Sequence, residues 1–379
     1  MRIKTAARRT VARKQSLRLE GNFAVVSSRY RETIMQRLAG CARVIVAATL
    51  LIVASVGNAK SQTVEQFYKG RQLTLLVFSG PGSTYDIYAR VLARHFGEHV
   101  PGKPVVIVQN MLGAGGLKVE QYIYRIAPKD GTVIGTIGRG LPFEPMLGEN
   151  EVHVDPLKFT WLGSMNRDVS LAMSWHTSKI KTFADLQQHQ LLVPGTGAGA
   201  DSEILPLAFN RLAGTKFKII EGYRDTPIAA LAMERGELDG LAYWSWSSIM
   251  AAHPDWIRDR KVNLLFHTGL DPISEVPAVP SLRNLVTNPT DKAALAFLLA
   301  REIIGRPFLA PPDLPPDRAA ALRSAFAATL RDPAFLQDAK RTRLDVSLVT
   351  GAETDALLKN SAGAPQEVIA RVKDALGRH

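Results

Sequence analysis

The chain has 379 residues, 46% of them hydrophobic and 22% charged, which is enough for two globular domains of ordinary composition. Its net charge of +12 lies mainly in residues 1–59, where 11 Lys and Arg face 2 Asp and Glu. The remaining residues hold 36 basic and 33 acidic side chains, and this near-neutral body argues against nucleic-acid binding.

The first 59 residues are predicted to be a leader with a secretory signal peptide. An apolar stretch of 13 residues, Val44 to Val56, follows the basic region and is too short to span a bilayer. Small residues ending at Ala59 suit signal peptidase, so we expect a periplasmic protein. Met35 would give a leader of ordinary length, which suggests that residues 1–34 are a gene-start artefact. Cys41, the only cysteine, would leave with the leader, so the mature chain would have no disulfide.

The rest of the chain alternates short apolar runs with amphipathic segments, a pattern typical of an α/β fold. Polar caps and Pro residues predict helices starting near Thr84, Thr182, Thr226, Asp317 and Pro365. The predicted strands are Leu73–Val77, Val105–Val108, Val133–Thr136, Val169–Ser174, Leu191–Val193, Phe217–Ile220, Leu238–Tyr243, Val262–Phe266 and Leu344–Val349.

Pro and Gly residues near 136–142 and 266–272 suggest two passages between lobes. Lobe one would comprise residues 60–138 and 268–379, and lobe two residues 139–267. Two parallel connections form a hinge that favours opening and closing of a cleft between the lobes.

A strand, a Gly-rich loop and a helix start occur twice, at residues 75–86 and 191–202. Unpaired N–H groups at a helix N-terminus favour anions, and glycines allow close approach to them. We therefore expect both loops to face one cleft and to hold a carboxylate or phosphate. Asp86 is expected to cap its helix, because its charge would repel an anionic ligand.

The second loop also fits the dinucleotide fingerprint, as Gly195-x-Gly197-x-x-Ala200, and Glu221 ends the next strand where a ribose-binding acid belongs. An NAD-dependent oxidoreductase is therefore an alternative hypothesis. A secretory leader argues against it, because free NAD is scarce outside the cytoplasm. One dinucleotide-binding domain would also not explain the related first loop.

Other side chains could hold the rest of the ligand. Arg139 or Arg224 could pair with a carboxylate, and Trp244 and Trp246 could share one face of an extended segment. We interpret the Gly-rich loop at residues 110–116 mainly as a segment that permits close packing and not as part of the ligand site. The candidate ligand-binding residues are Ser79, Gly80, Pro81, Gly82, Ser83, Thr84, Tyr85, Arg139, Thr196, Gly197, Ala198, Gly199, Ala200, Asp201, Ser202, Tyr223, Arg224, Trp244 and Trp246.

The sequence offers little support for catalysis or metal binding. It has no G-x-S-x-G elbow, and no carboxylate pair stands out for acid–base work. His95 and His99 have helical spacing, but no further ligand follows nearby. We expect no catalytic residue, cofactor or metal.

Six segments in this order resemble the periplasmic solute-binding receptors of tripartite tricarboxylate transporters, and the likeness covers nearly all of residues 65–379. The segments are GPGSTYDIYARVLARHF (80–96), PVVIVQNMLGAGG (104–116), APKDGTVIGT (127–136), GTGAGADS (195–202), ALAMERGELDG (230–240) and YWSWSS (243–248).

The resemblance implies a two-lobed, venus-flytrap fold in which residues 80–85 and 196–202 hold one ligand carboxylate. It implies a receptor that captures a small carboxylate and delivers it to one large and one small membrane subunit. We expect the receptor to be a monomer that binds no nucleic acid. Ser83 and Thr84 replace part of the family's glycine run, and Arg224, Asp225 and Thr226 stand where small residues are common. A ligand-sensing subunit of a periplasmic signalling complex would have the same site and is a further alternative.

Overall fold

The computed structural model describes residues 62–148, 154–197, 200–269 and 272–378, and the chain from Thr63 onward forms one compact unit. The predicted leader lies outside the described residues. Within them, no helix combines the length and the apolar character needed to cross a membrane.

The described part contains a mixed six-stranded sheet with the order β11-β4-β10-β3-β1-β2. Strand β1 is parallel to β2 and β3, whereas β10 is antiparallel to β3 and β4, and β11 is antiparallel to β4. The strands are β1 (Gln72–Val77), β2 (Val105–Asn110), β3 (Val133–Thr136), β4 (Thr160–Ser164), β10 (Pro307–Ala310) and β11 (Val349–Thr350).

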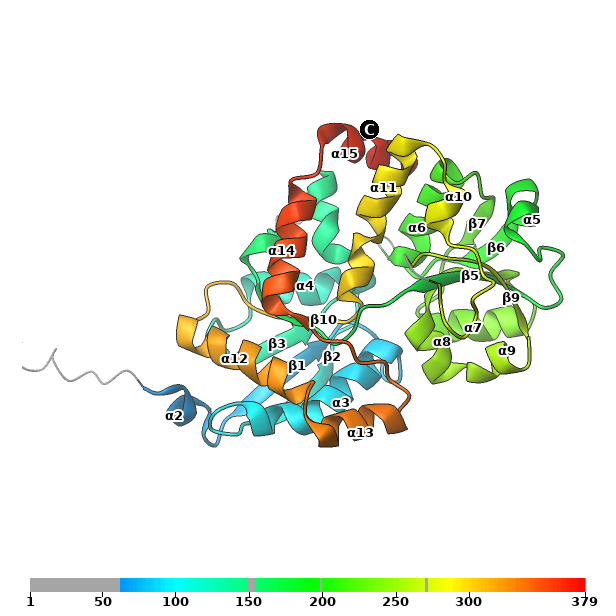
Figure 1. The fold of residues 1–379 in the computed structure, drawn as a ribbon. Helices are drawn as coiled ribbons and strands as arrows, with labels where there is room; N and C mark the ends of the chain where they lie inside the picture. The colour runs from blue at the N-terminus through cyan, green and yellow to red at the C-terminus, as the bar shows by residue number, and fades with distance from the viewer. Residues whose placement is uncertain (1–61, 149–153, 198–199, 270–271, 379) are drawn as a thin grey trace, which may run out of the picture. The chain divides into compact units, whose positions relative to one another are not determined.

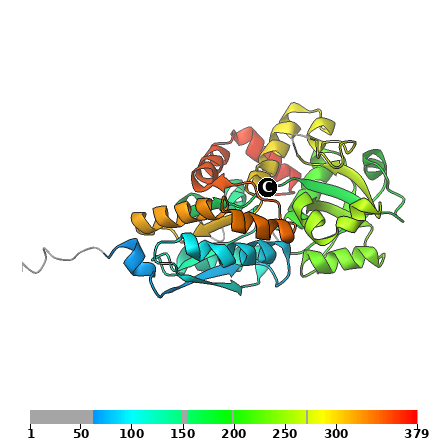
Figure 2. The same ribbon diagram turned by 60° about the horizontal axis from the view of Figure 1, so that its bottom comes forward.

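Helices cover both faces of this sheet because alternate strand residues point to opposite sides. Leu75 and Val77 pack in a core with α3 (Thr84–His99), α12 (Pro316–Thr329) and α13 (Pro333–Arg341). Leu76 enters another core, with side chains of α4 (Leu117–Arg125) and α14 (Gly351–Ala362). Figures 1 and 2 show these two helical layers with the sheet between them.

A second group of strands forms a three-stranded antiparallel sheet, β8-β5-β9, and a two-stranded parallel sheet, β6-β7. The strands are β5 (Ser170–Trp175), β6 (Leu191–Pro194), β7 (Phe217–Ile220), β8 (Gly240–Ser245) and β9 (Val262–His267). The helices of this part are α5 (Phe183–Gln188), α6 (Asp201–Leu212), α7 (Thr226–Glu234), α8 (Trp246–Ala252), α9 (Pro254–Arg258), α10 (Leu282–Leu285) and α11 (Pro289–Leu299).

The C-terminal helix α15 (Gln366–Ala375) packs against α11 and α6, beside the second group of strands (Figure 1). Val372 shares a buried core with Phe209 of α6 and Leu295 of α11. The shorter elements are α2 (Val64–Tyr68), η1 (Ala114–Gly116), η2 (Leu141–Leu147), η3 (Pro156–Lys158) and η4 (Ala300–Ile304). The C-terminal end of the chain therefore contributes to both halves of the fold.

Two strands of the six-stranded sheet were not predicted from the sequence, and one predicted strand was largely wrong. β4 and β10 are short, and each contains a residue typical of loops, Gly163 in β4 and Pro307 at the start of β10. Of the predicted strand 344–349, only Val349 is in a strand. The preceding residues make isolated contacts instead, such as the hydrogen bond from the Ser347 N–H to the Met165 carbonyl at 2.9 Å.

Sheet membership suggests a different division into lobes from the one expected. Residues 160–164 pair within the six-stranded sheet, although the expected division groups them with residues 139–267. The chain reaches β5 through residues 165–169 and returns to β10 through residues 300–306. We therefore propose that the hinge includes these two connections.

Candidate ligand-binding site

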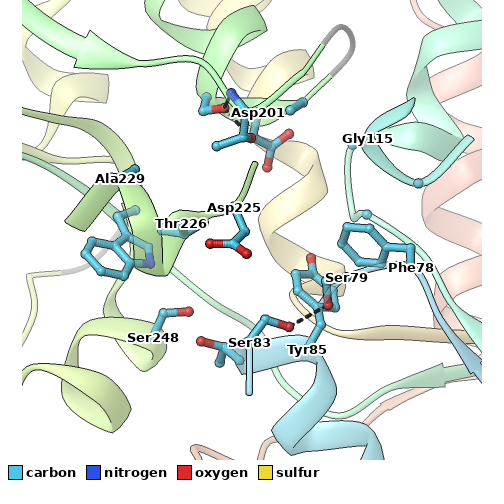
Figure 3. A pocket seen from close by; sticks show the side chains of 18 of the residues that line it. Phe78, Ser79, Ser83, Tyr85, Gly115, Asp201, Asp225, Thr226, Ala229 and Ser248 are labelled. Atoms are coloured by element: carbon cyan, nitrogen blue, oxygen red, sulfur yellow. Dashed lines mark hydrogen bonds between the residues drawn. The ribbon is translucent and has the colours of Figure 1, made fainter. Parts of the chain in front are cut away.

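Loops from both groups of strands enclose a cavity of about 460 Å³ (Figure 3). Most of the candidate residues line it: Ser79, Gly80, Ser83, Thr84, Tyr85, Arg139, Thr196, Ala200, Asp201, Ser202, Arg224 and Trp244. The candidates that do not line it are Pro81, Gly82, Gly197, Tyr223 and Trp246. Ala198 and Gly199 lie outside the described residues. The two Gly-rich loops therefore meet at one cavity, and binding at these residues stays a prediction.

The loop between β1 and α3 presents hydroxyl and amide groups to this cavity. Ser83 is the N-cap of α3, and its Oγ accepts a hydrogen bond from the Asp86 N–H at 3.3 Å. The Ser79 and Ser83 hydroxyls lie 2.6 Å apart. Helix geometry leaves the first N–H groups, those of Thr84 and Tyr85, without an intrahelical acceptor. This helix start suits a carboxylate.

Asp86 does not line the cavity, and it holds the loop in place, while Ser83 is the N-cap of the helix. Its Oδ2 accepts hydrogen bonds from the Gly82 N–H and from Nε of Arg90, both at 2.8 Å. Its Oδ1 accepts one from Nδ2 of Asn110 at 2.8 Å, which ties the loop to β2. Burial raises the pKa of Asp86, but Arg90 and these hydrogen bonds outweigh burial and hold it below its ordinary value.

The loop between β6 and α6 is not equivalent to the first. The Gly197 N–H donates to Oε1 of Glu203 at 2.8 Å, and the Thr196 N–H donates to Oγ of Ser202 at 3.1 Å. Asp201 adds a carboxylate at the first residue of α6. Side chains of the following helix therefore accept from the Thr196 and Gly197 N–H groups, and carboxylate binding by residues 196–202 stays a prediction.

Arg139 lines the cavity but is 5% exposed, and its charge is paired. Its Nε donates to Oδ2 of Asp201 at 3.0 Å, and its Nη2 donates to Oγ of Ser170 at 2.8 Å. Asp201 also accepts from Nη1 of the fully buried Arg301 at 2.7 Å. Burial raises the pKa of Asp201, but the charges of Arg301 and Arg139 outweigh burial and lower it.

Arg306, which the sequence analysis did not single out, has a similar buried position, 2% exposed. Its Nη1 lies 3.1 Å from Oδ2 of Asp168, and its Nη2 donates to Oγ of Ser245 and Ser248 at 3.0 and 2.9 Å. Its guanidinium also lies over the Tyr85 ring, 4.6 Å from the centroid. This arginine joins the connection before β10 to the cavity wall formed by α8.

One tryptophan, Trp244, lines the cavity with Tyr85 and Phe78. The expectation that Trp244 and Trp246 share one strand face is wrong, because β8 ends at Ser245 and Trp246 is the first residue of α8. Tyr223 packs against the buried core beneath α7. The apolar wall of the cavity therefore draws on aromatic side chains from both halves of the fold.

Several other lining residues escaped the sequence analysis. The loop at residues 110–116, interpreted mainly as packing, contributes its last five residues to the wall. The loop also packs closely against the neighbouring strand end, since a methyl group on Gly116 would lie 3.1 Å from the Phe78 ring. The spacing of the Gly-rich run could have indicated the cavity. Tyr243 and Ser248 belong to the YWSWSS segment and Asp225 follows Arg224, but the sequence analysis did not name these three lining residues as candidates.

The two histidines with helical spacing serve packing between helices. Nε2 of His95 lies 3.1 Å from Oδ2 of Asp338, and Nε2 of His99 lies 3.0 Å from Oδ2 of Asp332. They contact different carboxylates, so they do not converge on one point. Among the described residues, no group of three or more His, Cys, Asp or Glu side chains could hold a metal ion.

The sequence matches no protein-family profile and no curated protein. Solved structures with a similar fold include the periplasmic binding protein BugD, with a TM-score of 0.65 and 19% identity over 81% of this chain and 98% of BugD. MatC from Rhodopseudomonas palustris, solved with bound malate, has a TM-score of 0.64 and 19% identity over 81% of this chain and 99% of MatC.

A TctC solute-binding protein from Polaromonas has a TM-score of 0.56 and 19% identity over 81% of this chain and 99% of its own. These likenesses extend over nearly the whole of each similar structure. They confirm, at the level of the fold, the resemblance that the sequence motifs indicated. The chain therefore has the two-lobed α/β fold of TctC- and BugD-type periplasmic binding proteins.

Proposed function

We propose that the protein is a periplasmic solute-binding receptor that captures a small carboxylate and delivers it to a membrane transporter of the tripartite tricarboxylate type. The observation that carries the proposal is the start of α3, whose Ser79 and Ser83 hydroxyls and first N–H groups border a cavity shared by both halves of the fold. The partners would be one large and one small membrane subunit, and the receptor would act as a monomer.

The size of the cavity and the similar structures support a small ligand. About 460 Å³ lies within the range of roughly 300–1,000 Å³ that is usual for small-molecule sites. MatC was solved with malate, and a second R. palustris protein of this fold, with a TM-score of 0.63, was solved with adipate. Both are carboxylates, which agrees with an anion held at a helix N-terminus.

The proposed mechanism is a shift between open and closed forms. A ligand that contacts both lobes stabilises the closed form by its additional contacts there. The α3 start contributes about 0.3–2 kcal/mol to binding an anion. Hydroxyl hydrogen bonds and burial against Tyr85 and Trp244 would supply the rest of the roughly −8 kcal/mol that micromolar affinity requires.

The NAD-dependent alternative receives no support from the second loop. Asp201 and Glu203 place two carboxylates in the first turn of α6, and Glu203 already accepts from the Gly197 N–H. The charge of Glu203 would repel a diphosphate at the place where the fingerprint requires it. The sensing alternative shares the proposed site and differs only in the protein that the closed receptor contacts.

A ligand screen tests the proposal. Thermal-shift measurements followed by calorimetry would compare mono-, di- and tricarboxylates with NAD(H) on the purified protein. We expect at least one small carboxylate to raise the melting temperature and to bind with micromolar affinity. Stabilisation by NAD(H) alone, with no response to any carboxylate, would reverse the assignment.

A further inference from the structure

Asp225 places a carboxylate in the cavity, opposite the start of α3. It is the N-cap of α7, and its Oδ1 accepts from the Ile228 N–H at 3.1 Å. Its Oδ2 reaches across to the first loop, 3.7 Å from where a methyl group on Gly80 would lie. Figure 3 shows this carboxylate projecting into the space between Asp201 and Ser83.

The other buried charges that line the cavity are paired within the protein. Arg139 is paired with Asp201, and Arg306 lies 3.1 Å from Asp168. Among the described lining residues, only the neighbours Arg224 and Asp225 form no ion pair. Arg224 is exposed, whereas Asp225 is half-buried. The Asp225 carboxylate therefore lies inside the cavity without an ion-pair partner. The Arg224 guanidinium, also without one, lies in solvent.

This arrangement disfavours a plain dicarboxylate. One carboxylate at the α3 start would leave the other close to the unpaired Asp225, and like charges in a partly buried site repel strongly. A ligand that carries an ammonium group beside its carboxylate avoids this repulsion. Its carboxylate would accept from the Thr84 and Tyr85 N–H groups, and its ammonium would donate to Oδ2 of Asp225, which lies beside Gly80 of the same loop.

We propose that Asp225 is the specificity-determining residue of this site and selects α-amino acids over the corresponding carboxylates without an amino group. The inference rests on the proposed function and names its ligand class. An α-amino acid separates its two charged groups by a single carbon, which suits the closeness of Asp225 to the first loop. The ammonium–carboxylate contact is a charge-assisted hydrogen bond, one of the stronger polar contacts in proteins.

Calorimetry with matched ligand pairs tests the inference. The pairs are alanine and propionate, aspartate and succinate, and 2-aminoadipate and adipate. We expect the unsubstituted protein to bind the amino member of at least one pair about tenfold or more tightly than its partner. Asp225→Asn should reduce that preference to about twofold or less, mainly by lowering the affinity for the amino acid of the pair.

Asp225→Asn retains an N-cap for α7, because Asn caps helices about as well as Asp. Asp332→Asn is the matched control, since Asp332 caps α13 and does not line the cavity. We expect this variant to keep the preference of the unsubstituted protein. That preference is measured without any variant, so it tests the inference even if Asp225→Asn fails to fold.

Two results would overturn the inference while leaving the proposed function in place. One is that the unsubstituted protein binds the ligands without an amino group as tightly as their amino-acid partners, or more tightly. The other is an equal loss of affinity for both members of a pair in Asp225→Asn. If no ligand of any pair binds and the wider carboxylate screen also fails, the proposed function itself is wrong, and the inference fails with it.

Discussion

At the scale of single residues, the cavity wall depends on arginines that the protein neutralises itself. Arg139 stands in a Gly-rich stretch, so the sequence could suggest that it reaches the cavity. Its pairing with Asp201 could not be predicted, because the two residues are 62 positions apart and meet only through the fold. The same holds for Arg306 and Asp168. Sequence patterns thus locate charged side chains more readily than they identify their partners.

Removing the charge of Asp201 should destabilise the fold. Asp201→Asn would leave the buried guanidinium groups of Arg139 and Arg301 without their shared carboxylate. We expect a loss of about 3 kcal/mol in the free energy of unfolding, the usual cost of breaking a buried ion pair. Urea denaturation measures it. Asp259→Asn, which removes an exposed partner of Arg258, should leave the unfolding curve unchanged, and equal curves for both variants would contradict the account.

Glu120 should make stability fall as pH rises. Its side chain is 2% exposed, and burial, together with the charge of Glu144, raises its pKa from 4.5 to about 8. The unfolded chain releases this proton near pH 4.5, whereas the folded protein holds it until about pH 8. The loss in the free energy of unfolding caused by Glu120 is therefore absent below pH 4.5, grows between pH 4.5 and pH 8, and is complete above pH 8.

Glu120→Gln should remove this dependence. We expect the variant to match the unsubstituted protein near pH 4.5 and to be more stable at pH 8.5, by up to about 5 kcal/mol. Unfolding by urea at both pH values measures the difference. Glu98→Gln, at an exposed position of α3, is the control and should change neither value. A constant difference between variant and parent at both pH values would disprove the assignment.

At the scale of elements, the strand–loop–helix units at β1–α3 and β6–α6 could be predicted from their Gly-rich loops. Ser83 caps α3 and Thr182 caps α5 in a capping box, as the sequence indicated. The difference between the loops could not be predicted, because it depends on the rotamers of Ser202 and Glu203. Strand β10 also escaped, since its first residue, Pro307, is typical of loops.

Two cap substitutions separate stability from binding. Ser83→Ala and Thr182→Ala each remove a side-chain acceptor at a helix start, and each should cost about 1 kcal/mol. Only Ser83 lines the cavity, so only Ser83→Ala should also weaken carboxylate binding. Thermal unfolding and calorimetry on both variants check this. Equal ligand affinity in the two variants would show that the α3 start does not hold the ligand.

At the scale of the whole molecule, alternating apolar runs and helix caps predicted a two-lobed α/β fold, and the similar structures confirm it. The positions of the passages between lobes were harder to predict. Strand β4 lies among residues expected in the second lobe, yet its partners β10 and β11 come from much later in the chain. Such long-range pairing leaves no local signal in the sequence.

The two connections at residues 165–169 and 300–306 predict a hinge. Saturation with a binding carboxylate should therefore shift the population towards the closed form and lower the radius of gyration. Small-angle X-ray scattering with and without ligand measures this change. A radius of gyration that stays the same at saturating ligand would contradict the hinge.

The central claim is that the start of α3 holds the carboxylate of a small ligand inside the shared cavity. A crystal structure of the protein with a ligand from the calorimetric screen tests it most directly. We predict that the ligand carboxylate accepts hydrogen bonds from the N–H groups of Thr84 and Tyr85. A carboxylate bound instead at the start of α6, or only by Arg224 in solvent, would contradict the account.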